Sequence, residues 1–208
     1  MAVAVQAVND RGLIFGGEVI HRGDLREVRS PADGSLVAHY VPATAADVDR
    51  AVAEARQQGR TWMRLHPDER ARVLRAAAEA IRAHVDDIAE VLTREQGKPV
   101  ADSVKEILFG ASVFDYYAEE GRRVHGSLRP NTDPDTVSMV SYHPVGVVAG
   151  IVPWNYPVDL YAWKVAPALA AGCPVVVKPP EEAPLAIGMV SQLLTDAGLP
   201  PGTLFDLP

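Results

Sequence analysis

The chain has 208 residues, a formal net charge of −7 and a hydrophobic fraction of 48%, which is typical of a soluble globular protein. The acidic balance and the lack of clustered Lys and Arg exclude a phosphate-neutralising nucleic-acid surface. With one cysteine, no secretory signal, no apolar run long enough to cross a membrane and no metal-ligand spacing among its histidines, we expect a cytoplasmic protein without membrane, nucleic-acid or metal partners.

Residues 1–124 are predicted to form short strands followed by helices. Apolar triplets between turns, such as Leu13–Phe15 before two glycines, predict a small antiparallel layer in the first forty residues. Thr44 is a predicted N-cap, Gly59 ends the first helix, and Pro67 opens a second. A third helical piece ends before Gly97, and a fourth spans about residues 100–124. The positions of this last helix that should face inward are Val104, Ile107, Leu108, Val113 and Tyr117.

Residues 125–143 have a different character, because two strand-like pieces flank the polar segment 129–135. This pattern predicts a long hairpin. Its second piece, residues 136–142, carries apolar side chains on both faces, so the hairpin should lie against another surface. That surface is either a second subunit or the hairpin's own domain, and the pattern alone favours neither.

Residues 144–208 alternate strand and helix patterns. The strands are near-continuous apolar runs, as parallel strands covered on both faces are. The chain is therefore predicted to be α/β, with a doubly wound sheet that is incomplete at residue 208. The predicted elements are 146–152, 157–171, 174–178, 184–197 and 203–207.

The turn from Pro153 to Pro157 follows the first of these strands, at the edge where open α/β sheets bind ligands. Asn155 offers a neutral amide donor suited to a developing oxyanion. An Asn at this place can equally cap the following helix. On that helix Tyr156, Leu160 and Trp163 share one face, which either lines a substrate tunnel or belongs to the core.

The turn after the second strand reads Lys178-Pro179-Pro180-Glu181-Glu182. Lys178 and Glu181 can meet the two hydroxyls of a nucleotide ribose as donor and acceptor, or they form a surface ion pair of little energetic value. No GxGxxG sequence is present, so a dinucleotide would not be held by the usual glycine fingerprint. Cys173, at the start of the second strand, is expected to be a buried, unreactive thiol.

These motifs together resemble the NAD(P)-dependent aldehyde dehydrogenases, over nearly the whole chain. The most specific stretches are PWNYP at 153–157, WKVAPALAAG at 163–172 and VKPPE at 177–181. The resemblance implies that Asn155 supplies the side-chain half of an oxyanion hole, and that Tyr156, Leu160 and Trp163 line the substrate tunnel. It also implies that Val152, Pro153 and Trp154 line the cofactor channel, while Lys178 and Glu181 bind the adenosine ribose.

The resemblance further implies NAD rather than NADP, because the Glu181 carboxylate would repel a 2′-phosphate. It makes the hairpin at 125–143 similar to the family's oligomerisation arm, and residues 1–124 and 144–208 similar to the N-terminal part of its cofactor-binding domain. The family's glycine-rich turn, general-base glutamate and nucleophilic cysteine have no counterpart in these 208 residues.

We therefore expect a truncated aldehyde dehydrogenase without its catalytic domain and inactive by itself, which is either a gene fragment or one half of an enzyme completed by another chain. As partners we expect a second copy of this chain or a complementary C-terminal chain. The alternative is a non-catalytic nucleotide-binding or assembly module.

Overall fold

The structure is a computed structural model that describes residues 10–208. Its helices are α1 (Ala45–Gln58), α2 (Arg60–Arg64), α3 (Pro67–Ala83), α4 (Val85–Gln96), α5 (Val100–Gly121), α6 (Pro157–Ala170) and α7 (Leu185–Asp196). Its strands are β1 (Leu13–Phe15), β2 (Glu18–Ile20), β3 (Arg26–Arg29), β4 (Leu36–Tyr40), β5 (Ser127–Arg129), β6 (Ser138–Val140), β7 (Val148–Ile151), β8 (Val175–Lys178) and β9 (Leu204–Asp206). The short helix α2 is absent from the prediction.

A five-stranded sheet in the order β2-β1-β9-β8-β7 forms the centre of the molecule. Strands β7, β8 and β9 are parallel, as predicted, whereas β1 joins β9 in antiparallel orientation. The predicted N-terminal layer is therefore divided: β1 and β2 extend the main sheet, and β3 and β4 form a separate two-stranded ribbon. Local patterns cannot foresee this division, because the partner of β1 lies at the other end of the chain.

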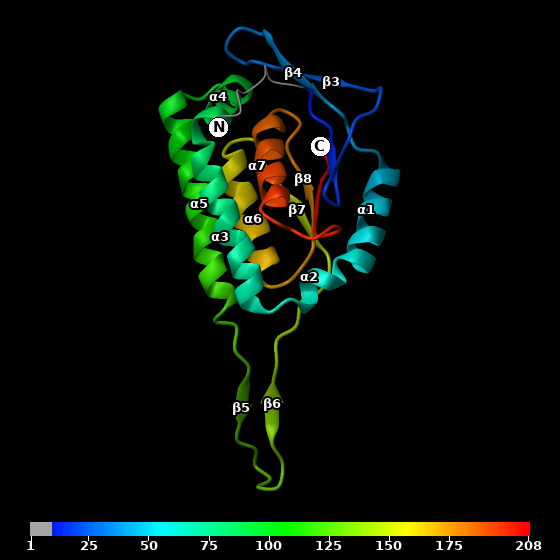
Figure 1. Ribbon diagram of the computed structural model, residues 1–208, viewed down its shortest axis with the longest axis vertical. Helices are drawn as coiled ribbons and strands as arrows, with labels where there is room; N and C mark the ends of the chain where they lie inside the picture. The colour runs from blue at the N-terminus through cyan, green and yellow to red at the C-terminus, as the bar shows by residue number, and fades with distance from the viewer. Residues whose placement is uncertain (1–9) are drawn as a thin grey trace.

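Helices cover both faces of the sheet, which confirms the doubly wound α/β prediction (Figure 1). The alternation of side chains along β8 shows the two sides: Val175 and Val177 belong to the core shared with α6 and α7, while Val176 packs with Ala51 and Ala55 of α1. Outside α6, the helices α3, α4 and α5 add a further layer (Figure 1).

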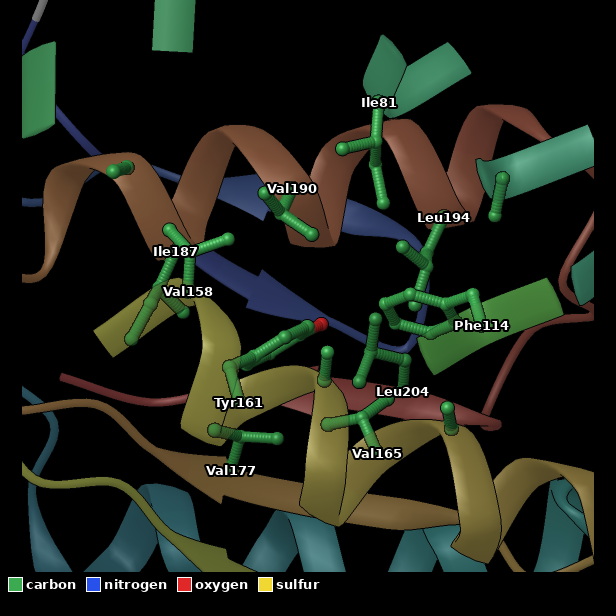
Figure 2. Packing of buried hydrophobic residues seen from close by; sticks show 14 of the residues in the cluster. Ile81, Phe114, Val158, Tyr161, Val165, Val177, Ile187, Val190, Leu194 and Leu204 are labelled. Carbon is green, nitrogen blue, oxygen red and sulfur yellow. The ribbon is translucent and has the colours of Figure 1, made fainter. Parts of the chain in front are cut away.

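Large apolar side chains fill the space between the sheet and the helices. In Figure 2, Tyr161 and Val165 of α6 face Val190 and Leu194 of α7, with the strand residue Leu204 between the two helices. Burial of each such side chain stabilises the fold by roughly 1.5–3 kcal/mol relative to exposure. The Tyr161 hydroxyl is not orphaned in this core, because it lies 2.8 Å from Ser191 Oγ.

Helix α5 packs closely against α6, and Gly121 makes this approach possible. A Cβ atom at Gly121 would lie 3.1 Å from both the Cβ and the carbonyl oxygen of Ala170. Of the positions predicted to face inward on α5, Ile107 and Val113 are buried, but Leu108 is exposed, so that prediction was wrong. Helix α5 carries apolar side chains around much of its circumference, and spacing alone does not tell which of them contact a neighbour.

The predicted hairpin is present as β5 and β6, paired in antiparallel register, and it extends away from the body of the molecule (Figure 1). Its own domain therefore does not cover it, and apolar side chains such as Leu128 and Met139 are 72% and 75% exposed. Within residues 10–208 no helix is both long and apolar enough to span a bilayer.

Candidate functional site

The two turns singled out in the sequence emerge side by side from the sheet. Strands β7 and β8 are adjacent and parallel, with Ile151 opposite Lys178. The backbone N–H of Val152 donates to the carbonyl oxygen of Lys178 at 3.0 Å, which ties the first turn to the end of β8. Both turns thus lie at the carboxyl edge of the parallel strands, where sheets of this class bind ligands.

Asn155 occupies the exposed tip of the first turn. The alternative role as a helix cap does not hold, because α6 has Tyr156 at its N-cap position and no side-chain cap from it. Side chains from the end of α4 and the α4–α5 connection hold this turn: the carbonyl oxygen of Asn155 lies 3.3 Å from Lys98 Nζ and 3.4 Å from Gln96 Nε2. The backbone of Asn155 is therefore held at its carbonyl, while its side chain is exposed.

The residues around Asn155 differ in exposure. Pro153 and Trp154 are exposed beside it, and Val152 is buried, so Val152 can reach a ligand only through its backbone. Trp154 and Glu181 line one cavity of about 350 Å³ together with Arg29 and Pro31, which precede β4. Residues of the two turns therefore share a cavity.

Lys178 and Glu181 lie close together, with 3.9 Å between Nζ and Oε1, and both are about half exposed. Sequence reasoning missed Arg26 of β3, whose guanidinium lies 3.3 Å from the other oxygen of Glu181. Arg26, Lys178 and Glu181 also line a neighbouring cavity of about 260 Å³ with Tyr40. The Glu181 carboxylate thus stands between two cations, and no local signal in the sequence indicates Arg26.

The predicted tunnel face of α6 is partly open rather than a core stripe. Tyr156 is 54% exposed and Trp163 41%, while Leu160 is half-buried. The Trp163 ring lies against α5, with its centroid 6.0 Å from Tyr117 in an edge-to-face arrangement. The ring centroid of Phe109, also on α5, lies 6.3 Å from that of Trp163.

Asp159 shares this face of α6, at the three-residue spacing from Tyr156. Burial raises the pKa of Asp159 above its usual range, and the nearby Glu106 carboxylate raises it further. Its Oδ1 atom is buried and has no partner among the described residues. A carboxyl group with one oxygen lacking a hydrogen-bond partner therefore lies beside the aromatic side chains.

Cys173 is 3% exposed, as expected of a structural thiol. It lies near the C-terminus of α6, where Arg70 Nε donates to the carbonyl oxygen of Ala170 at 3.1 Å. In the described part of the chain, no group of three or more His, Cys, Asp and Glu side chains could hold a metal ion.

Comparisons of the sequence and of the structure with known proteins both find aldehyde dehydrogenases. A sequence model described as the aldehyde dehydrogenase family matches residues 21–207. Two similar curated relatives are mitochondrial succinate-semialdehyde dehydrogenases. The one from Arabidopsis thaliana is 39% identical over 93% of this chain and 37% of its own length. The one from Oryza sativa subsp. japonica is 37% identical over 97% of this chain and 38% of its own length.

Among solved structures, an aldehyde dehydrogenase from Brucella melitensis biovar abortus 2308 superimposes with a TM-score of 0.95 at 34% identity, over all of this chain and 43% of its own. An Escherichia coli NADP dependent enzyme gives 0.93 at 33% identity, over 96% of this chain and 42% of its own. PnpE in complex with nicotinamide adenine dinucleotide gives 0.91 at 36% identity, over 95% of this chain and 41% of its own.

This chain thus spans 37% to 43% of the length of these proteins. It belongs to the aldehyde dehydrogenase family and corresponds to the N-terminal part of the relatives that it matches.

Proposed function

We propose that these residues supply the cofactor-binding turns and the oxyanion donor of an enzyme that oxidises an aldehyde to a carboxylic acid with NAD. The observation that carries this proposal is the pairing of Ile151 with Lys178, which brings the Asn155 turn and the Glu181 turn to one edge of the sheet. In such an enzyme the nucleophile attacks the aldehyde carbonyl, and the Asn155 amide donates to the oxygen that becomes negative.

The residues of the second turn fit a nucleotide ribose. A vicinal diol needs one donor and one acceptor close together, and the exposed Lys178 ammonium and Glu181 carboxylate provide both within 3.9 Å. When bound, the nicotinamide cofactor supplies the hydride acceptor of the oxidation. We infer a preference for NAD over NADP, because a 2′-phosphate would approach the Glu181 carboxylate.

We infer that the aldehyde is neutral or cationic. Burial favours the protonated form of Asp159, but the carboxyl still brings its acceptor oxygens to the tunnel face that holds the Tyr156 and Trp163 rings, and this disfavours a negatively charged substrate. Aromatic faces, in contrast, attract cations. The relatives named for succinate semialdehyde handle an aldehyde that carries a carboxylate, so we propose that this chain's substrate differs from theirs in charge.

The described residues offer no exposed thiol, since the single cysteine of the sequence, Cys173, is buried. An oxyanion donor does not replace a nucleophile. We therefore expect these 208 residues alone to oxidise aldehydes at no enzymatic rate, and to gain activity when combined with the C-terminal part of a relative.

The first experiment is an NAD titration of the 208-residue chain, followed by tryptophan fluorescence, because Trp154 lines the same cavity as Glu181. We expect saturable quenching that the double change Lys178→Ala/Glu181→Ala abolishes. The control is Asp102→Ala/Lys105→Ala, an exposed pair of the same three-residue spacing on α5. Quenching that survives the loss of Lys178 and Glu181 would refute the assignment of the ribose site.

We further propose that the hairpin of β5 and β6 is a contact between subunits. Its exposed apolar side chains, among them Leu128, Val137 and Met139, are uncovered in the single chain. Changing Leu128 and Met139 to Ser should shift the chain towards monomer in sedimentation velocity, whereas Asp133→Ser at the hairpin tip should not. Equal sedimentation of all three proteins would argue against this contact.

A further inference from the structure

We propose that Glu106 and Lys98, which are far from Asn155 in sequence, are positioning residues for the turn from Pro153 to Pro157. They fix the backbone of Asn155 and thereby the direction in which its side-chain amide donates. This inference rests on the proposed role of Asn155. Neither residue is expected to touch substrate or cofactor.

Helix α6 needs an external cap. Its first residue is Pro157, and no side chain at its N-cap position accepts a hydrogen bond. The backbone N–H groups of Val158 and Asp159 in the first turn would otherwise be without partners in a buried or half-buried place. Glu106 of α5 satisfies them: its Oε1 accepts from Val158 at 2.9 Å and from Asp159 at 3.4 Å.

Glu106 has no solvent exposure, so its negative charge requires compensation. The compensation comes from Lys98, whose ammonium forms an ion pair with Oε2 of Glu106 and whose side chain is only 10% exposed. Because Oε1 faces α6 and Oε2 faces Lys98, both oxygens of the carboxylate are in use. The pair is therefore a fixed element between the α4–α5 connection and the start of α6.

Lys98 also contacts the functional turn directly. Its Nζ lies 3.3 Å from the carbonyl oxygen of Asn155 and 4.3 Å from the centroid of the Tyr156 ring. One ammonium thus binds a buried carboxylate, the peptide of Asn155 and the face of an aromatic ring on the tunnel side. Since the Asn155 side chain itself is exposed, its direction depends on how its backbone is held.

A second glutamate serves as an internal comparison. Glu95 of α4 is buried and caps α7, accepting from Leu185 and Ala186 at 2.7 and 2.8 Å. Helix α7 follows the other turn, the one that carries Lys178 and Glu181. Glu95 caps the neighbouring helix with the same geometry, but its hydrogen bonds go to α7 and not to the Asn155 turn.

The test measures the backbone ¹H–¹⁵N signals of Asn155 and Tyr156 in the 208-residue chain. We expect Lys98→Met and Glu106→Gln to shift or broaden these signals. Lys98→Arg should leave them close to their wild-type positions, because Arg keeps the cation. Glu95→Gln should instead move the signals of Leu185 and Ala186 and leave Asn155 in place. Lys98→Met keeps the test decisive if Glu106→Gln fails to fold.

A purely structural role would perturb the turn in proportion to lost stability. Trp62→Phe, which removes a buried hydrogen bond at the far end of α6, provides that control. Unchanged Asn155 and Tyr156 signals in folded Lys98→Met, or equal changes in Trp62→Phe at matched melting temperature, would overturn the proposal.

The NAD titration separates this result from the proposed function. Failure of the wild-type chain to bind NAD would count against the cofactor site, while the signals of Asn155 would still decide the role of Lys98. In an active enzyme assembled with this chain, Lys98→Met should lower kcat by about tenfold or more and leave the KM for NAD within about twofold.

Discussion

The Glu95 carboxylate accepts the backbone N–H group of Leu185 at 2.7 Å, across ninety residues of sequence. The second oxygen accepts from Ala186, so one buried side chain caps the helix that follows the turn of Lys178 and Glu181. Burial raises the pKa of Glu95 to about 8, although the two backbone N–H groups act in the opposite direction. The helix start is therefore coupled to the protonation of a single carboxyl group.

This coupling predicts how stability depends on pH. In the unfolded chain Glu95 titrates near 4.5, and in the folded chain near 8. The folded state therefore holds the proton over this interval, and the free energy of unfolding should fall as pH rises from about 5 to about 8. Glu95→Gln should reduce this slope. Urea unfolding across the interval checks it, and an identical slope in wild type and variant would contradict the assignment.

Asp47 should contribute to stability in the opposite pH range. Its carboxylate accepts from Thr44 N at 2.7 Å and from Arg22 at 2.6 Å, and these partners hold its pKa well below 3.8. Its contribution is present above the unfolded-state value and is lost as pH falls through the folded-state value. Asp47→Asn should cost about 1–3 kcal/mol at neutral pH. Unfolding measured at neutral and acid pH tests this, with the exposed Asp49→Asn as the control that should change little.

Trp62 should be sensitive to loss of its ring nitrogen. The fully buried indole donates from Nε1 to the carbonyl oxygen of Leu169 at 2.9 Å, at the end of α6. Trp62→Phe leaves that carbonyl without its donor and should cost about 1–3 kcal/mol in denaturant unfolding. The exposed Trp163→Phe is the matched comparison. A loss for Trp62→Phe no greater than for Trp163→Phe would show that the hydrogen bond contributes nothing.

If Lys178 and Glu181 bind the ribose as proposed, Arg26 should moderate the choice between NAD and NADP. Its guanidinium lies 3.3 Å from Glu181 and partly offsets the carboxylate charge that a 2′-phosphate would meet. Arg26→Gln should therefore weaken NADP binding by about threefold to tenfold relative to NAD, or about 0.7–1.4 kcal/mol. The control is Arg72→Gln on α3, an exposed arginine that pairs with Glu69 and lines neither cavity of the site. An equal loss of affinity for NAD and NADP in the Arg26 variant would show that Arg26 supports cofactor binding without affecting the choice between the two.

The features that the sequence predicted well are local ones. Thr44 and Gly59 bound α1 as expected, because capping chemistry acts within a few residues. The parallel strands around Val175 and the two turns that follow β7 and β8 were predicted from apolar runs and adjacent prolines. In each case the signal and the structure lie in the same short segment.

The features that the sequence did not reveal are contacts between distant segments. Arg26 meets Glu181 across 155 residues, and Glu106 meets Val158 across 52. Such pairs produce no periodic pattern in the sequence, and a glutamate on a helix is normally predicted to be a solvated surface residue until its neighbours are known. The exposure of Leu108 has the same origin, because helical spacing defines a face without saying what covers it.

The pairing of Ile14 with Asp206, and of Phe15 with Phe205 beside it, also has a consequence for biosynthesis. Strand β1 lies between β2 and β9, so one of its two edges has no partner until nearly the whole described segment has left the ribosome. Such long sequence separations slow folding. The first strands made are thus among the last to be completed, and in the interval they are exposed to chaperones and to wrong partners.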